Sequence, residues 1–304
     1  MLLIHIGYHK TGTTWLRHRL FSREDLNFRL FSRYSGEMGA LLHPHALDFD
    51  PEACRRRFAA ALDRCEADGK VAVLMHERLS GDPHSGGYDS KEMAERLRRT
   101  FPEARVLIGI REQRSMILSF YKQYVKYGGA CSLHDYLNVR KDHRLPMFSL
   151  AHLKFHRLIA LYRSLFGCAN VLVQPYEKFK LDPASYVRAI ASFCSVDAPD
   201  GLPYGDHVNV PMKPVALQAK RLLNPFIRRD SLNANSPYVV EWLGRPSQRL
   251  LQLLDRSVPS SFNARVEARW KSAIDEAVNG HYEESNRMTT SLVGEDLRGY
   301  GYRL

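Results

Sequence analysis

The sequence lacks the patterns that mark several classes of protein. Its five cysteines form no C-x-x-C pair and show no metal-ligand spacing, so we predict neither a metal site nor a disulfide framework and expect reduced thiols in a cytoplasm. It contains no run of eighteen apolar residues. Because the chain reads as a core strand from Leu2 onwards, we expect neither a transmembrane segment nor a signal peptide.

The composition is that of a globular protein with an excess of positive charge. The 304 residues are 44% hydrophobic, which is enough for a large core, and we predict a single α/β domain over residues 1–304. The 44 Lys and Arg residues outnumber the 33 Asp and Glu residues, giving a net charge of +11. This charge suits a phosphorylated nucleotide, an anionic glycan, a nucleic acid or a membrane surface, and alone it does not choose among them.

Short apolar strands alternate with helical segments along the chain. This order predicts an α/β fold with a P-loop-like, mostly parallel sheet that has helices on both faces and helical insertions. Ligands of such sheets bind outside the carboxyl ends of the strands. The four expected strands are residues 2–6, 70–75, 105–110 and 170–174.

A glycine-containing loop follows the first strand. Four residues separate Gly7 from Gly12, as in the phosphate-binding motif G-x-x-x-x-G-K-[ST]. Thr13 occupies the position of the motif's lysine, however, and Lys10 lies inside the loop instead. The backbone N–H groups of such a loop, with the positive end of the helix that begins near Gly12, bind an anion. We therefore predict a phosphate-binding loop without the lysine clamp for a triphosphate.

Several motifs resemble one enzyme family. The string HKTGTTW, residues 9–15, resembles the 5′-phosphosulfate loop of the sulfotransferases that use 3′-phosphoadenosine 5′-phosphosulfate (PAPS). Arg111 after the third strand and Ser119 eight residues on are similar to that family's 3′-phosphate site, and Tyr176 after the fourth strand resembles its adenine-contacting tyrosine. The C-terminal block is similar to the ending of bacterial members, whereas the basic RKG loop of the cytosolic animal enzymes is missing.

The resemblance implies a cytoplasmic, bacterial enzyme of the carbohydrate type. It would move a sulfuryl group from PAPS to an acceptor hydroxyl by in-line displacement and release 3′,5′-adenosine bisphosphate (PAP). No metal is required where the protein supplies the positive charge, and Lys10 is placed to neutralise the leaving oxygen. The predicted donor-binding residues are Lys10, Thr11, Gly12, Thr13, Thr14, Trp15, Arg111, Ser119 and Tyr176.

The acceptor hydroxyl must lose a proton, so a general base is needed within hydrogen-bond reach of it. His76 and Glu77 directly follow the second strand. Because successive strand residues point to opposite faces, we expect only one of them to face the site. In the resembled family, animal cytosolic members use a histidine near this strand end and carbohydrate-type members use a glutamate. We favour Glu77, with His76 as the alternative.

The acceptor is predicted to be a saccharide or another small, hydroxylated, polar molecule. Residues 23–50, 80–89, 126–148 and 195–240 are expected to shape its site. Their histidines, arginines and tyrosines suit a sugar or an anionic glycan better than a steroid. We interpret residues 195–240 as a lid or acceptor-facing cap.

Two other functions compete with this interpretation. A P-loop kinase of a small metabolite needs a lysine after Gly12 and usually an acidic residue for magnesium at a neighbouring strand end, and the chain has Thr13 and Arg111 there. A non-enzymatic polyanion binder would use the positive charge, but it leaves the HKTGTTW string unexplained. No DNA- or RNA-binding motif is present, so we do not expect a nucleic-acid partner.

Overall fold

The computed structural model describes residues 1–31, 36–139, 147–205, 212–227, 232, 239–240 and 244–304. Contacts between Cα atoms divide the chain into two compact units. The first unit comprises Met1–Glu112, Ala151–Val208 and Tyr282–Leu304, and the second comprises Gln113–Leu150 and Asn209–His281. The strands of the described chain all belong to the first unit. The single-domain organisation stays a prediction.

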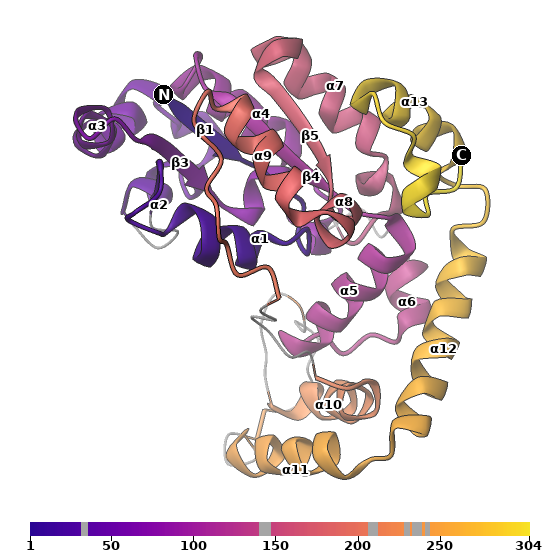
Figure 1. Ribbon diagram of the computed structural model, residues 1–304. Helices are drawn as coiled ribbons and strands as arrows, with labels where there is room; N and C mark the ends of the chain where they lie inside the picture. The colour runs from indigo at the N-terminus through magenta and orange to yellow at the C-terminus, as the bar shows by residue number, and fades with distance from the viewer. Residues whose placement is uncertain (32–35, 140–146, 206–211, 228–231, 233–238, 241–243) are drawn as a thin grey trace. The chain divides into compact units, whose positions relative to one another are not determined.

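The first unit is built on a five-stranded parallel sheet with the strand order β2-β3-β1-β4-β5 (Figure 1). This confirms the predicted α/β fold, and the four predicted strands are present. The sequence pattern misses β2, because only the first of its three residues is fully buried. The strands are β1 Leu2–His5, β2 Phe28–Leu30, β3 Val71–Met75, β4 Arg105–Ile110 and β5 Val171–Pro175.

Helices connect the strands of the first unit. The residues after the glycine loop form α1 and continue as a π-helical segment, η1. The α-helices and the π-helical segment are α1 Thr13–Trp15, η1 Leu16–Phe21, α2 Gly36–Leu42, α3 Pro51–Ala67, α4 Ser90–Thr100, α7 Phe155–Phe166, α8 Tyr176–Leu181, α9 Pro183–Phe193 and α13 Glu283–Val293. Short 3₁₀ turns are η2 Ala46–Asp48, η3 Glu77–Ser80, η4 Pro83–Ser85, η5 Leu150–Leu153, η6 Cys168–Asn170 and η8 Leu297–Tyr300.

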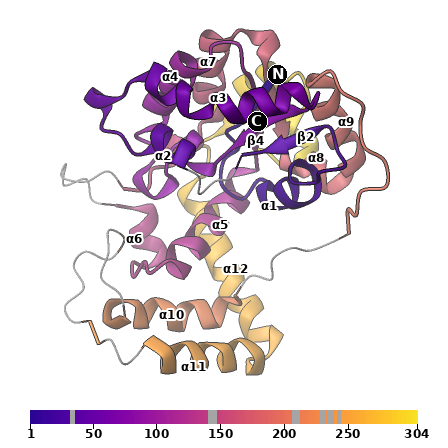
Figure 2. The ribbon, with the colours of Figure 1, turned by 90° about the vertical axis from the view of Figure 1, so that its left-hand side faces the viewer.

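Both faces of the sheet are covered by helices, as predicted (Figure 2). On one face η1 and α9 pack in a single apolar cluster with alternate strand residues, including Leu3, Val73 and Leu107. On the other face α3 packs on β3, and α7 packs on β4 and β5. The sheet is therefore buried on both sides, which explains the continuous apolar runs of its strands. Polar residues follow the strands at the edge of the sheet where the carboxyl ends of the strands lie.

Side-chain caps begin two of the covering helices where the sequence predicts them. Asp50 accepts hydrogen bonds from the N–H groups of the first turn of α3, at 2.9 and 3.1 Å. Asp182 accepts one from Ser185 N at 2.9 Å at the start of α9. A proline at the first helical position follows each cap, where its missing N–H is not needed.

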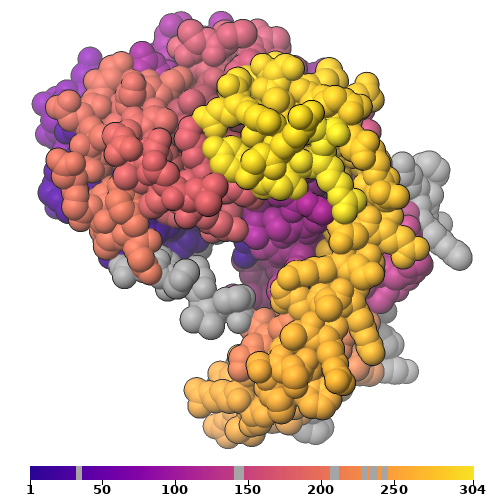
Figure 3. Space-filling view, turned by 45° about the vertical axis from the view of Figure 1, so that its right-hand side comes forward, coloured from indigo at the N-terminus to yellow at the C-terminus, as the bar shows by residue number. Residues whose placement is uncertain are grey.

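The C-terminal segment belongs to the first unit. Helix α13 packs on α7, and His156 Nδ1 lies 2.7 Å from the buried Ser285 hydroxyl. Figure 3 shows this segment, in yellow, on the surface beside α7. Residues 278–282 separate α13 from the preceding helix, α12 Ser260–Ala277.

The second unit is helical in its described residues. The buried Asn224 side chain donates to Val125 O and Gly129 O, both at 2.8 Å, which ties α10 to the end of α5. Lys122 of α5 pairs with Glu267 of α12 at 2.8 Å. The helices are α5 Gln113–Lys126, α6 Leu133–Leu137, α10 Pro214–Ile227, α11 Gly244–Ser257 and α12 Ser260–Ala277.

The predicted lid, residues 195–240, is described only in part. Helix α10 lies within it, whereas residues 206–211, 228–231 and 233–238 lie outside the described part of the chain. Its role as a lid stays a prediction. In the part of the chain that the structure describes, no helix is long and apolar enough to cross a bilayer.

Candidate active site

The loop between β1 and α1 is held by its own hydrogen bonds. The Thr11 hydroxyl donates to Tyr8 O at 2.6 Å, and Tyr8 N donates to Gly109 O of β4 at 3.2 Å. Lys10 has a φ of 70° and Gly12 a φ of 80°. A left-handed conformation costs a residue with a side chain on the order of 1 kcal/mol, and such strain gathers at functional sites. The loop therefore holds Lys10 in one defined, exposed position.

The Tyr176 ring lies directly against the loop. A Cβ atom added to Gly12 would lie 3.1 Å from Tyr176 Cε2, so a side chain here would crowd the ring, and the φ of 80° also favours glycine. The Arg111 guanidinium lies 5.3 Å from the centroid of the Tyr176 ring, and Arg111 Nη1 donates to Lys10 O at 3.2 Å. The structure thus brings Arg111 and Tyr176, which are distant in the sequence, to Lys10 and Gly12 of the loop.

Glu77 faces the loop from the end of β3. Its Oε1 accepts a hydrogen bond from the Thr13 hydroxyl at 3.2 Å and lies 3.8 Å from Arg17 Nη2. The side chains of Arg17 and Glu77 are only 14% and 19% exposed. The carboxylate is therefore oriented towards the predicted donor loop. Arg17, four residues after Thr13 on the same helical segment, is a contact that the sequence analysis missed.

His76, the other candidate base, is held differently. Its Nδ1 accepts a hydrogen bond from Arg78 N at 3.1 Å, as the cap of η3. A neutral ring bonded in this way carries its proton on Nε2, which can then donate but not accept. His76 is thereby placed to donate a hydrogen bond rather than to remove a proton.

A group of histidines surrounds the loop next to Lys10. Burial lowers the pKa of His9, and the neighbouring His84, His152 and His76 lower that pKa further. Burial also lowers the pKa of His84, and it lowers that of His152 to about 4. At neutral pH these imidazoles are uncharged, so each offers one donor and one acceptor to a ligand.

His5 lies beneath the loop. A Cβ on Gly7 would lie 2.7 Å from His5 Nε2, so the loop passes directly over the ring. Neither ring nitrogen has a hydrogen-bond partner among the described residues. Burial lowers the pKa of His5 to about 4, opposed by the charge of Glu77. His5 is thus a neutral residue that supports the loop from the core side.

The remaining predicted site residues lie in three different environments. Trp15 is buried, donates to Pro203 O at 3.2 Å and stacks on Tyr204 with a centroid distance of 5.4 Å. Thr14 is half-buried in α1. Ser119 lies half-buried on α5 in the second unit. Ligand contacts by these three residues stay predictions.

Lys180 and Glu177 of α8 are polar neighbours of Arg111 that the sequence analysis did not include. Lys180 Nζ lies 4.9 Å from the centroid of the Tyr176 ring. The two carboxylate oxygens of Glu177 accept from Glu112 N at 3.1 Å and from the Tyr302 hydroxyl at 3.3 Å. The spacing of four residues between Tyr176 and Lys180 on one helix was the available signal for Lys180.

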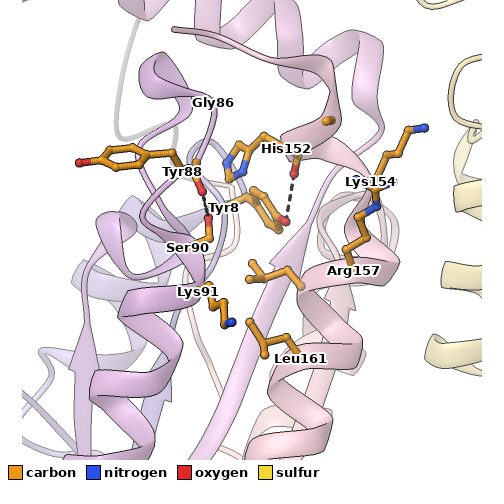
Figure 4. Close-up of a pocket in the computed structure, with 12 residues that line it drawn as sticks. Tyr8, Gly86, Tyr88, Ser90, Lys91, His152, Lys154, Arg157 and Leu161 are labelled. Carbon is orange, nitrogen blue, oxygen red and sulfur yellow. Dashed lines mark hydrogen bonds between the residues drawn. The ribbon is translucent and has the colours of Figure 1, made fainter. Parts of the chain in front are cut away.

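A cavity of about 280 Å³ opens on the other side of the loop, between the turn before α4 and the first turn of α7 (Figure 4). Tyr8 reaches it from the loop, and its hydroxyl donates to His152 O at 3.3 Å. Lys91, Lys154 and Arg157 contribute positive charge to its lining. Hydrogen-bond donors and acceptors therefore lie next to the loop at this cavity.

Comparison with known proteins identifies the family of the chain. Residues 2–204, well over half of the chain, match the family model of the sulfotransferase domain. Among solved structures, the chain is similar to a sulfotransferase from Alicyclobacillus acidocaldarius, with 16% identity and a TM-score of 0.48 over 85% of this chain and 97% of that chain. No curated protein sequence matches. On the strength of the family match, the chain belongs to the sulfotransferase family.

Proposed function

We propose that this sulfotransferase takes its sulfuryl group from PAPS and transfers it in line to a hydroxyl of a polar acceptor. The observation that carries the proposal is the meeting of Lys10, Arg111 and Tyr176 around Gly12. A nucleotide with phosphate groups at the 3′ and 5′ positions of its ribose needs cations at two places and an apolar surface for its base. The three side chains meet that need.

The loop would hold the 5′ end of the donor. N–H groups at the start of the helical segment after Gly12 supply hydrogen bonds and the positive end of a dipole. Arg111 remains charged at any physiological pH and would hold the 3′-phosphate. The Tyr176 ring offers an apolar face to the adenine.

The chemistry is a single displacement at sulfur. A bond forms between the acceptor oxygen and sulfur while the bond between sulfur and the 5′-phosphate oxygen breaks. Lys10 would neutralise the charge that develops on the leaving phosphate oxygen, and Glu77 would take the proton of the acceptor hydroxyl. Two contacts support Glu77 over His76: Glu77 faces Thr13 in the loop, and the ring of His76 accepts at Nδ1.

The acceptor side is proposed to take a saccharide or a similar hydroxylated molecule. Neutral imidazoles at His9, His84 and His152 can donate to and accept from sugar hydroxyls. The basic residues of the neighbouring cavity suit an acceptor that also carries negative charge. Within the predicted acceptor segments, residues 32–35, 140–146, 206–211, 228–231 and 233–238 lie outside the described chain.

Calorimetric binding of PAP in EDTA tests the donor proposal, with 5′-AMP and magnesium-ATP as comparisons. We expect metal-free binding of PAP that drops sharply when the 3′-phosphate is removed. Preference for magnesium-ATP would instead support the kinase. That function would then have to work with Thr13 at the position where a P-loop has its lysine. Absence of nucleotide binding would favour the polyanion binder.

A further inference from the structure

We propose that Lys180 is the second cation of the donor's 3′-phosphate site and that it acts together with Arg111. This inference rests on the proposed use of PAPS. A phosphate monoester carries a charge of about −1.5 to −2 at pH 7, so a single arginine leaves part of it without a partner. The chain lacks an RKG segment near its C-terminus that could supply the rest.

The geometry places two cations on one ring. Arg111 Cζ and Lys180 Nζ lie 5.3 and 4.9 Å from the centroid of the Tyr176 ring. That ring lies against Gly12 of the loop. Lys180 is four residues after Tyr176 on α8, so the helix itself directs the ammonium group along the ring. Both cations therefore lie next to the ring that contacts the donor loop.

The charges around Lys180 favour an incoming anion. Partial desolvation lowers the pKa of Lys180, although its side chain is largely exposed, and the positive charge of Arg111 lowers the pKa further. Glu177 and Glu112 oppose this effect, but the Glu177 oxygens accept from Glu112 N and the Tyr302 hydroxyl. Among the ion pairs of the described residues, none includes Lys180. Two neighbouring cations without a salt-bridged carboxylate at Lys180 repel each other, and a doubly charged phosphate relieves that repulsion.

Lys180 differs in this respect from the other lysine of the same helix. Lys178 forms an ion pair with Glu295 and so fastens α8 to the C-terminal segment. Lys180 is exposed and makes no such pair in the described chain. Lys178 therefore has a structural role, whereas the ammonium group of Lys180 is available to bind a ligand.

The test compares two nucleotides that differ only in the 3′-phosphate. PAP and 5′-AMP are titrated in EDTA into the full-length wild type, Lys180→Gln and Lys180→Arg. We expect Lys180→Gln to weaken PAP binding about tenfold and to leave 5′-AMP binding within about twofold, because one charge-assisted hydrogen bond is lost. Lys180→Arg should retain most of the affinity for PAP.

Arg188→Gln is the matched control, because it removes one positive charge from a side chain that is 62% exposed on the neighbouring α9. It should bind both nucleotides as the wild type does. Equal losses of PAP and 5′-AMP binding in Lys180→Gln, or no loss, would overturn the assignment. A wild type that does not distinguish PAP from 5′-AMP would overturn the proposed donor as well, so the two failures are distinct.

Discussion

The Thr13 hydroxyl donates a hydrogen bond to Oε1 of Glu77 at 3.2 Å, which joins the donor loop to the residue that we propose as the general base. β1 and β3 are adjacent parallel strands, so their carboxyl ends deliver the two residues to the same edge of the sheet. Arg17 lies 3.8 Å from the same carboxylate oxygen. The carboxylate is thus oriented by two residues of the helical segment after the loop.

Glu77→Gln keeps an oxygen that can accept from Thr13 but cannot take up a proton. We expect kcat to fall by about 10²- to 10⁴-fold, the usual contribution of a positioned base, with PAP affinity unchanged. Steady-state kinetics and calorimetry on the same preparation check the two parts. His76→Gln is the companion variant and should lower kcat far less. Full activity of Glu77→Gln would move the role of base to His76 or to another residue.

Lys10→Ala should remove most of the turnover. Loss of one group that balances transition-state charge costs about 10²- to 10³-fold in kcat. The side chain is exposed, so we expect the thermal unfolding midpoint to stay near that of the wild type. Lys271→Ala, which removes a lysine that is 62% exposed on α12, serves as the control. A turnover of Lys10→Ala close to that of the wild type would remove Lys10 from the mechanism.

Arg111→Ala should weaken nucleotide binding in a way that depends on the 3′-phosphate. A hydrogen bond to a charged group contributes about 1.5–3 kcal/mol, so PAP affinity should fall about 10- to 100-fold and 5′-AMP affinity much less. Arg114→Ala, three residues further on, removes an arginine that pairs with Asp275 at 3.5 Å and should leave both affinities unchanged. Equal weakening of PAP and 5′-AMP binding would contradict the assignment of Arg111 to the 3′-phosphate.

The buried His5 predicts a loss of stability in acid. Burial lowers its pKa to about 4 in the folded protein, below the value of about 6.5 in an unfolded chain. As the pH falls from 6.5 towards 4, the unfolded state therefore binds the proton first and the free energy of unfolding decreases. The stability is fully present above pH 6.5, and His5 accounts for a loss of about 2 kcal/mol at pH 5.

Urea unfolding of the wild type and His5→Leu at pH 7 and pH 5 measures this effect. Contributions from the other buried histidines are common to both proteins and cancel in the comparison. The wild type should lose about 2 kcal/mol more than His5→Leu between the two pH values. Equal losses would show that His5 titrates alike in the folded and unfolded states.

Much of the sheet could be predicted from the sequence, because strands buried on both faces leave continuous apolar runs. The run at 105–110 coincides with β4. β2 could not be predicted, because it has three residues and pairs only with β3 at the edge of the sheet. An edge strand of that length leaves no periodic signal, so the sequence pattern gives no indication of the strand within residues 23–50.

The residues of the candidate site could be predicted where they belong to one local sequence motif. They could not be predicted where only contacts between distant segments bring them to the site. The loop residues up to Thr14 form one string, whereas the contact between Lys180 and Tyr176 becomes meaningful only once α8 lies against Gly12. Trp15 belongs to the same string, and a string alone does not show that its indole packs on Tyr204 and donates to Pro203 O. Its ligand contact stays a prediction.

The bond from Arg111 to the Lys10 carbonyl bears on the speed of donor binding. Together with the bond from Thr11 to Tyr8, it holds the loop at its left-handed residue. The loop therefore needs no rearrangement when an anion arrives, and folding has already met the cost of ordering it. We expect association rates governed by diffusion and by the net charge of +11, and hence slower association as the ionic strength rises.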